Sequence, residues 1–208
     1  MDNLLNKEPV KRAQEHLKNF DKNRKITVLE ETARTAQDAS KALKCEVGAI
    51  VKSLLFRAGD GFILCLVSGD KKCSLNKLKK ITQKNDLCMA TPDEVKTQTG
   101  YTIGGVSPVG LINKIEIFMD SSLERFNKLY AAAGHPNCIF EINFKELNTI
   151  TSSKIRSVLW VSQMVLKPSK KPLSGGMHPI FPATGSTIMA AIWPRLDSKI
   201  FLTASKLL

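Results

Sequence analysis

Lys52 stands in an otherwise apolar run, residues 49–56. Side chains alternate along a β-strand, so Ile50, Lys52 and Leu54 share one face and the ammonium lies beside apolar neighbours. A lysine in such surroundings is costly unless it meets an anion, and this favours contact with a phosphate or an ester group. An edge strand offers the alternative, in which the lysine extends its ammonium into water. Ser53 points to the opposite face of a regular strand.

A glycine-rich loop, residues 104–110, could supply a second part of a reaction site. Gly104 and Gly105 carry no side chain that obstructs the backbone, and glycine can adopt a positive φ, so successive amides can converge on one oxygen. An ester carbonyl needs such donors when it gains negative charge in a tetrahedral intermediate. The same residues also suit a simple turn, and their spacing is neither that of a P-loop nor that of a dinucleotide-binding loop.

His135 lies between Gly134 and Pro136, where the flanking residues fix the backbone. An isolated histidine is often structural, and a place on the wall of a binding pocket is the alternative. No Ser-His-Asp or Cys-His arrangement is indicated, because Ser107 in the glycine loop has no evident activating partner. We therefore expect a water molecule, rather than a side chain, to be the nucleophile of any hydrolysis here.

The charge of the chain points to a polyanionic partner. The 208 residues carry a formal net charge of +12, while the apolar share of 43% is ordinary for a globular protein. Such an excess favours nucleic acid through counterion release, although it also suits a basic surface that only keeps the protein soluble. One basic stretch could follow an RNA backbone or form a solvated helix face: Lys71, Lys72, Lys77, Lys79 and Lys80.

The five cysteines form no C-x-x-C pair and have no metal-ligand neighbour at the usual spacing. They indicate reduced thiols in a reducing compartment, and we expect neither a metal nor a cofactor. The first residues are too charged for a signal peptide, and no run reaches the ~18 apolar residues needed to cross a bilayer. The sequence predicts a cytoplasmic protein without a membrane partner.

Hydrophobic spacing predicts the elements that position these residues. Helices are expected at 8–20, from about Thr35, at 74–81, and from a capping box at Thr91 to Gly100. Asp120 suits a helix cap better than a ligand for a substrate amino group. Residues 143–147 could open a short helix, and residues 58–61 form a hairpin turn. Strands are expected at 26–29, 49–56, 62–67, 115–119, 128–133 and 138–142.

This irregular alternation, with several hairpin-like joins, predicts an α/β fold: a compact mixed sheet with surrounding helices. Beyond about residue 156 the chain becomes basic and is interrupted by proline and glycine. We therefore divide it into a domain at 1–155 and an irregular C-terminal extension at 156–208, which is either loosely ordered or docked as a short helix.

Four segments in order resemble the YbaK/EbsC and prolyl-tRNA-synthetase editing-domain family. They are residues 50–56 (IVKSLLF), 64–70 (LCLVSGD), 89–110 (MATPDEV through GYTIGGVSPVG) and 131–136 (AAAGHP). Each segment alone is weak evidence for the family, whereas four segments in the same order with the expected gaps form a specific pattern. The resemblance covers roughly residues 10–155 and excludes the extension.

The resemblance implies metal-free hydrolysis of mischarged aminoacyl-tRNA on a compact mixed α/β fold. It assigns catalysis to Lys52, Gly104 and Gly105, and makes His135 a residue that orients the aminoacyl group. A role for the substrate's own ribose hydroxyl is also implied by the family. The implied substrate-binding residues are Ser53, Thr102, Ile103, Val106, Ser107, Pro108, Gly134, His135 and Pro136.

Two functions remain open on the sequence. One is a trans-acting deacylase for a small amino acid such as Ala, Cys, Ser or Thr, with aminoacyl-tRNA as its partner and a possible association with a synthetase or the translation machinery. The other is a non-catalytic module that binds tRNA on the same fold. A small-molecule esterase is disfavoured, because neither an activated nucleophile nor a metal site is visible.

Overall fold

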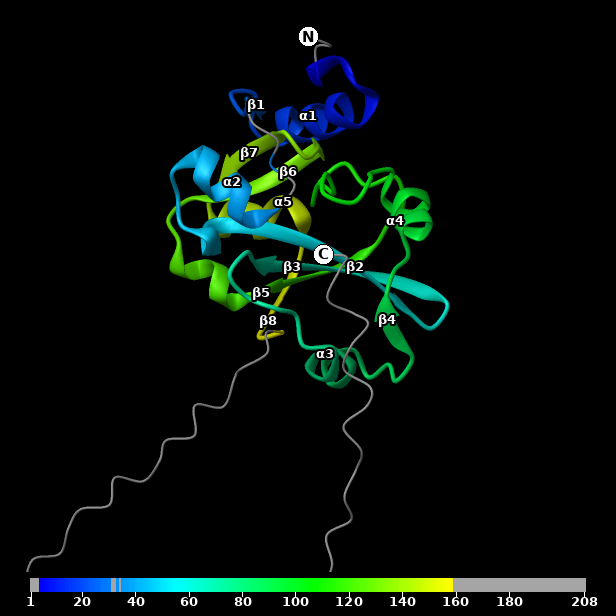
Figure 1. Cartoon of the computed structure of the whole chain (residues 1–208). Coiled ribbons are helices and arrows are strands. Elements are labelled where there is room, and N and C mark those ends of the chain that lie inside the picture. Colours follow the sequence, from blue (N-terminus) through cyan, green and yellow to red (C-terminus); the bar gives the residue numbers. More distant parts are fainter. Residues whose placement is uncertain (1–3, 31–32, 34, 159–208) are drawn as a thin grey trace, which may run out of the picture. The chain divides into compact units, whose positions relative to one another are not determined.

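The computed structural model describes residues 4–30, 33 and 35–158 of the chain (Figure 1). Within these residues there are short 3-10 turns at Leu4–Asn6, Val47–Ala49 and Ser121–Arg125. The helices are α1 (Glu8–Phe20), α2 (Ala36–Leu43), α3 (Leu75–Thr82), α4 (Pro92–Thr99) and α5 (Phe144–Thr151). The strands are β1 (Thr27–Val28), β2 (Ile50–Ala58), β3 (Gly61–Ser68), β4 (Leu87–Met89), β5 (Glu116–Asp120), β6 (Leu129–His135), β7 (Cys138–Ile142) and β8 (Lys154–Arg156).

The strands form one mixed sheet in the order β1-β7-β6-β2-β3-β5-β8, and β4 pairs with β2 off this path. The pairs β2–β3, β6–β7, β1–β7 and β2–β4 are antiparallel, whereas β2–β6, β3–β5 and β5–β8 are parallel. A mixed sheet with surrounding helices was expected from the irregular order of elements, and this fold class is confirmed.

Strand β2 has a gap in the pairing along one of its edges. Its other edge pairs with β3 along the strand, from Val51 to Ala58. On the gapped edge, β6 pairs only at Ile50 and Val51, and β4 pairs only from Phe56 onward. In the part of the chain that the structure describes, no strand pairs with this edge at residues 52–54. On this edge the backbone of these residues has no strand partner between β6 and β4.

Helices cover the sheet on both faces and build two main cores. Val10 and Leu17 of α1 pack into the larger core, which also contains Val51 and Leu55 of β2. Leu78 of α3 packs into a second core with residues of β2 and β3 from the opposite face. Figure 1 shows the corresponding arrangement, with α1 above β6 and β7 and α3 at the opposite end. Strand β2 thus separates two apolar regions and contributes side chains to both.

The predicted helices at 8–20 and after Thr91 are confirmed. Thr91 accepts a hydrogen bond from the amide of Glu94, whose side chain accepts from the amide of Thr91, and Gly100 ends α4 with φ +74°. Asp120 is confirmed as a cap, because its carboxylate accepts from the amide of Ser122 at 2.8 Å. The second carboxylate oxygen accepts from the amide of Val158 at 2.7 Å, so Asp120 is engaged by the protein itself.

Strands β4 and β8 were not predicted from the sequence. Each has three residues, too few to show the alternation that marks a strand, and each is defined by its pairing with a longer neighbour. Strand β8 pairs with β5, and Val158 is fully buried, so the chain packs against the sheet as far as Val158. The expected extension otherwise lies outside the described residues.

Candidate functional site

The glycine loop and the turn that carries His135 touch backbone to backbone. The amide of Gly134 donates to the carbonyl oxygen of Gly105 at 3.1 Å. A Cβ on Gly105 would lie 2.9 Å from both the N and the Cα of His135, closer than real side chains approach. Gly104 has φ +88°, and its missing Cβ would lie 3.4 Å from Cγ of Pro136. The structure therefore brings together two segments that the sequence separates by thirty residues.

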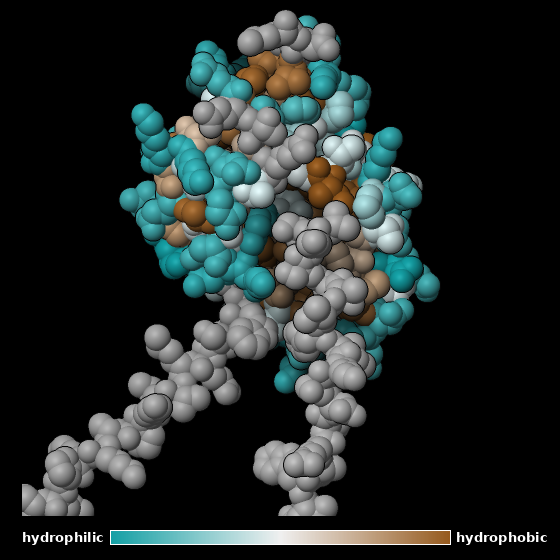
Figure 2. Space-filling model, in the orientation of Figure 1, coloured by the Kyte–Doolittle hydropathy of each residue, from teal (hydrophilic) through white to brown (hydrophobic). Residues whose placement is uncertain are grey.

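One end of the glycine loop is exposed to solvent, and the other end is buried. Thr102, Ile103 and Gly104 are exposed, and Ile103 retains 59% of its accessible surface. Figure 2 shows a hydrophobic patch over this loop, beside a hollow in the middle of the same face. The later residues from Gly105 to Val109 are buried. Ser107 is fully buried, and its hydroxyl accepts from the amide of Val109 at 3.3 Å.

The backbone amides of the loop are only partly used by the protein. The amide of Gly105 donates to the carbonyl oxygen of Thr102 at 3.0 Å, so this donor is occupied. Among the described residues, the amides of Gly104 and Val106 have no protein acceptor. The donors that remain for a substrate oxygen thus include those on either side of Gly105, whereas the Gly105 amide itself is occupied, which the sequence alone could not show.

His135 presents a neutral imidazole. Its Nδ1 accepts a hydrogen bond from the amide of Asn137 at 3.2 Å. Partial burial lowers the pKa of His135 below its ordinary value of 6.5, and the nearby Lys7 ammonium lowers it further. Because Nδ1 is the acceptor, the proton of the neutral ring resides on Nε2. The ring therefore offers an N–H donor at the end that does not contact Asn137.

Lys52 lies on the gapped edge of β2, and its ammonium is held on the side away from the loop. Its Nζ donates to the carbonyl oxygen of Lys71 at 2.5 Å. Val51 and Leu55 belong to the core that contains Val106 of the loop, whereas Leu54 packs against the second core. Strand alternation therefore places Lys52 with Leu54. Among the described residues, no hydrogen bond joins Lys52 to the loop.

Burial lowers the pKa of the Lys52 ammonium, and the carboxylate of Asp70 partly restores it. Asp70 is itself fixed by neighbours, since it accepts from the Ser68 hydroxyl at 2.6 Å and from the Arg125 guanidinium at 3.1 Å. Burial would raise the pKa of Asp70, but these hydrogen bonds and the Arg125 charge lower it overall. Asp70 and its two partners, Ser68 and Arg125, thus hold the turn after β3. The Lys71 carbonyl of this turn accepts the hydrogen bond from the Lys52 ammonium.

Ser53 lies on the face of β2 that packs with the glycine loop, and Pro108 is a residue of that loop. The hydroxyl of Ser53 is buried and has no hydrogen-bond partner among the described residues. Strand alternation places it with Val51 and Leu55, in the direction of the core that includes the loop. Pro108 is buried within the loop. A buried hydroxyl without a partner is unusual in folded proteins, and it is available to a ligand.

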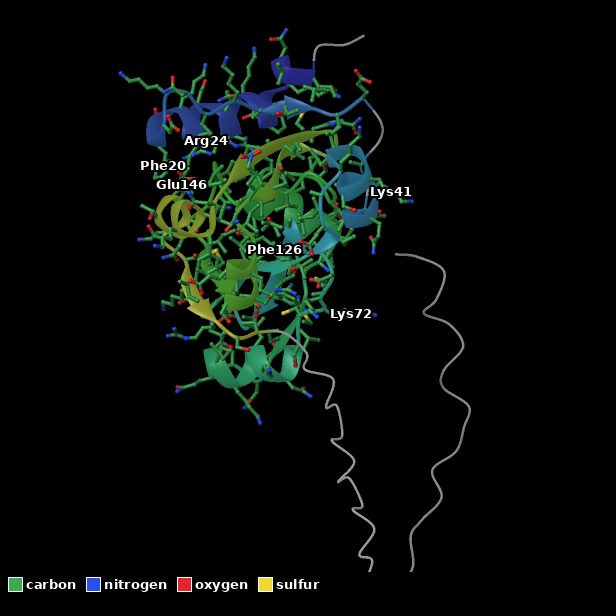
Figure 3. The ribbon with its side chains drawn as sticks, turned by 90° about the vertical axis from the view of Figure 1, so that its left-hand side faces the viewer. Phe20, Arg24, Lys41, Lys72, Phe126 and Glu146 are labelled. Atoms are coloured by element: carbon green, nitrogen blue, oxygen red, sulfur yellow. The ribbon has the colours of Figure 1, made fainter. Side chains whose placement is uncertain are left out.

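The basic stretch surrounds the start of α3. Lys71, Lys72 and Lys80 are exposed, while Lys77 and Lys79 are half-buried. Lys71 also forms an ion pair with Asp70 at 3.7 Å. Figure 3 shows Lys72 and Lys41 extending away from the protein on its right-hand side, which is the face seen in Figures 1 and 2. Lys41 and Lys72 therefore project from the face that carries the hollow.

Asp70, Arg125 and Arg12 were not singled out from the sequence, although all three bind residues that flank the site. Asp70 lies within the SGD segment of the family resemblance, which was a signal that could have found it. Nothing in the local sequence marks either arginine, because the bonds that tie Arg12 to Gly100 and Gly110, and Arg125 to Asp70, span 55 or more residues.

No helix in the described residues combines the length and apolar character needed to cross a membrane. No group of three or more His, Cys, Asp or Glu side chains in the same residues could hold a metal ion.

The sheet order and the contact between the loop and the His135 turn define an α/β domain of the YbaK-like editing type. A candidate trans-editing enzyme for prolyl-tRNA synthetase, known from a crystal structure, superposes with a TM-score of 0.71 at 34% identity. The match covers 74% of this chain and 99% of that protein.

Sequence comparison gives the same result. The model of the aminoacyl-tRNA editing domain matches residues 30–150. The uncharacterized protein YwhH of Bacillus subtilis is 35% identical over 147 residues, which make up 70% of this chain and 93% of that protein. A proline–tRNA ligase of Thermosipho melanesiensis is 28% identical over 153 residues, although the match spans only 26% of the ligase. The chain belongs to the aminoacyl-tRNA editing domain family, a class of aminoacyl-tRNA deacylases.

Proposed function

We propose that this protein hydrolyses the ester bond of mischarged aminoacyl-tRNA in trans, by attack of a positioned water and without a metal. The observation that carries the proposal is the contact of Gly105 with His135 beside the gapped edge of β2. This contact puts the Gly104 and Val106 amides beside the turn that carries the His135 Nε2–H. The proposal adds the Ser53 hydroxyl as a further donor, because it is buried without a hydrogen-bond partner among the described residues.

Each of these groups has a defined part in the proposed reaction. The Gly104 and Val106 amides stabilise the oxyanion that forms when water attacks the ester carbonyl. The neutral His135 donates from Nε2 to the aminoacyl group and holds it against the loop, rather than acting as a base. The ribose hydroxyl of the substrate takes part in handling the proton of the attacking water. Ser53, Thr102, Ile103, Gly134 and Pro136 surround the aminoacyl and terminal adenosine groups.

Lys52 has an electrostatic part in this scheme. Its ammonium lies across β2 from the loop that binds the ester, so it neutralises the terminal phosphate of the bound tRNA rather than the ester end. Half-buried surroundings strengthen that attraction relative to water. On binding, a phosphate oxygen replaces or joins the Lys71 carbonyl as the acceptor of the ammonium. Val106, Ser107 and Pro108 contribute by giving the loop its shape, since their side chains are buried.

The substrates we propose are tRNAs that carry a small amino acid such as Ala, Cys, Ser or Thr. Selection by size works within narrow limits, because one methylene changes discrimination by only ~1–3 kcal/mol. The lysines at 71, 72, 77, 79 and 80 bind the acceptor stem. Such a substrate places the protein in the cytoplasm, in contact with a synthetase or the translation machinery.

A panel of mischarged tRNAs tests the proposal. The purified protein should release alanine, cysteine, serine or threonine from at least one of them, and Lys52→Ala should remove most of this turnover. Lys128→Ala is the matched control, because Lys128 is an exposed lysine paired with Glu141 rather than with the turn after β3. A folded protein that leaves the whole panel intact would refute the deacylase assignment.

A non-catalytic tRNA-binding module is the second candidate. One observation favours it, namely that the Gly105 amide and the Lys52 ammonium are both occupied by protein carbonyls. This function predicts salt-dependent tRNA binding with no release of the amino acid. The deacylation panel therefore separates the two candidates directly.

A further inference from the structure

Arg12 of α1 ties together the two ends of the segment that contains the glycine loop. Its Nε donates to the carbonyl oxygen of Gly110 at 2.8 Å, and its Nη2 donates to the carbonyl oxygen of Gly100 at 2.9 Å. The third nitrogen, Nη1, forms an ion pair with Glu8 one helical turn earlier. One guanidinium thus binds two carbonyls that lie ten residues apart, and its ion pair with Glu8 of the same helix fixes its orientation.

Tyr101 completes this clamp from inside the domain. The guanidinium carbon of Arg12 lies 4.7 Å from the centre of the Tyr101 ring, a cation–π distance. The phenol is 1% exposed and lies within hydrogen-bond distance of two acceptors, the carbonyl oxygens of Val109 at 2.8 Å and Gly110 at 2.9 Å. Burial raises the pKa of Tyr101, although the Arg12 charge opposes it, so the phenol keeps the proton that it donates.

The same helix also supports the turn that carries His135. A Cβ on Gly134 would lie 2.6 Å from the carbonyl carbon and oxygen of Pro9, in the first turn of α1. Gly134 has φ +85°, so both the space and the backbone conformation require glycine. Helix α1 therefore contacts the histidine turn through Pro9 and the loop through Arg12, three residues later on the helix.

We propose that Arg12 is a positioning residue for the deacylation site: it holds the amides of the 104–110 loop at a fixed distance from His135. This inference rests on the proposed function. Arg12 lies outside the residues 30–150 that match the family model. The clamp needs the planar fork of arginine, because a lysine ammonium at the end of its flexible stem cannot serve both carbonyls in the same geometry.

The test compares Arg12→Lys and Arg12→Ala with Arg24→Lys. Arg24 is a matched control, since it also pairs with a carboxylate, Glu146 at 3.0 Å, and donates to a distant carbonyl, that of Glu141 at 2.8 Å. Figure 3 shows Arg24 and Glu146 close together on the side of the protein opposite Lys41 and Lys72. Both arginines contribute to stability, but only Arg12 contacts the loop segment.

We expect kcat of Arg12→Lys to fall by about 10-fold or more, and that of Arg12→Ala by about 100-fold, because a loop displaced by 1 Å loses its alignment with the reacting ester. KM for the tRNA should stay within about twofold, since Arg12 does not contact the RNA in this scheme. Arg24→Lys should lower the melting temperature without changing kcat. Unchanged kcat in both Arg12 variants, or an equal loss in Arg24→Lys, would overturn the inference.

Amide hydrogen exchange separates this inference from the proposed function. If the wild-type protein hydrolyses no ester, the proposed function fails, yet the clamp can still be measured. Arg12→Ala should accelerate exchange of the Gly105 and Val109 amides while the amides of β3 keep their protection. Unchanged exchange at Gly105 and Val109 would overturn the clamp, whatever the activity of the wild type.

Discussion

Gly105 and His135 approach so closely that no side chain fits between them. A Cβ on Gly105 would lie 2.9 Å from the backbone N and Cα of His135, and the Gly105 carbonyl accepts the amide proton of the adjacent Gly134 at 3.1 Å. Both atoms that the Cβ would meet belong to the backbone, so no side-chain rotation can relieve the clash. The separation between loop and histidine turn is therefore set by glycine itself.

Gly105→Ala should push the loop away from the histidine turn. We expect a loss of stability of about 1–3 kcal/mol from overpacking, together with a fall in kcat of about 10²-fold from lost alignment. Thermal denaturation and single-turnover deacylation measure the two effects. Gly61→Ala is the control, because a Cβ there would meet nothing closer than 3.9 Å and its φ is not positive. Wild-type kcat in Gly105→Ala would show that the contact has no part in the reaction.

Asp70→Asn should shift the pH dependence of deacylation. Burial lowers the pKa of Lys52 below its ordinary value of 10.5, while the Asp70 carboxylate raises it. The charged ammonium is the form that attracts phosphate, so activity should fall as the pH rises through the pKa of Lys52. Removing the Asp70 charge lowers that pKa further, and the alkaline decline should therefore begin at a lower pH.

The measurement is enzyme-dependent deacylation as a function of pH, after subtraction of the spontaneous hydrolysis of the ester. Asp60→Asn is the control, since Asp60 lies in the β2–β3 turn and does not contribute to the pKa of Lys52. An alkaline limb at the same pH in Asp70→Asn and in the wild type would contradict the role of the Lys52 charge. A uniform loss of activity at every pH would indicate a structural effect of Asp70 instead.

The sequence predicted those parts of the fold that local rules determine. The capping box at Thr91 and the left-handed Gly100 end α4 at the expected residues, because each depends on neighbours within one helical turn. Alternation along β2 correctly separated Lys52 from Ser53, and the two strand faces do meet different cores. The short strands β4 and β8 were missed because pairing, rather than propensity, creates them.

Only part of the site could be predicted from the sequence, for the same reason. The loop and His135 could be suspected from their residue types, but the contact between Gly105 and His135 depends on how β6 leaves β2 after Val51. The bonds from Arg12 to Gly100 and Gly110 span 88 and 98 residues. The spacing of residues in a single sequence cannot predict contacts between residues so far apart. Nor could it predict that the Gly105 amide is hydrogen-bonded within its own loop.

The basic stretch around the start of α3, which includes Lys72 on the face that carries the hollow, should account for most of the salt dependence of tRNA binding. Lys72→Ala and Lys80→Ala remove exposed ammonium groups, and each should raise KM and reduce the slope of log K against log salt by about 1 if it contacts a phosphate. Deacylation at several salt concentrations gives both quantities. Lys145→Ala is the control, because Lys145 is exposed on α5, the helix of Glu146, on the opposite side in Figure 3. Equal slopes for all three variants and the wild type would show that the RNA lies elsewhere, since a phosphate contact cannot be removed without releasing fewer counterions.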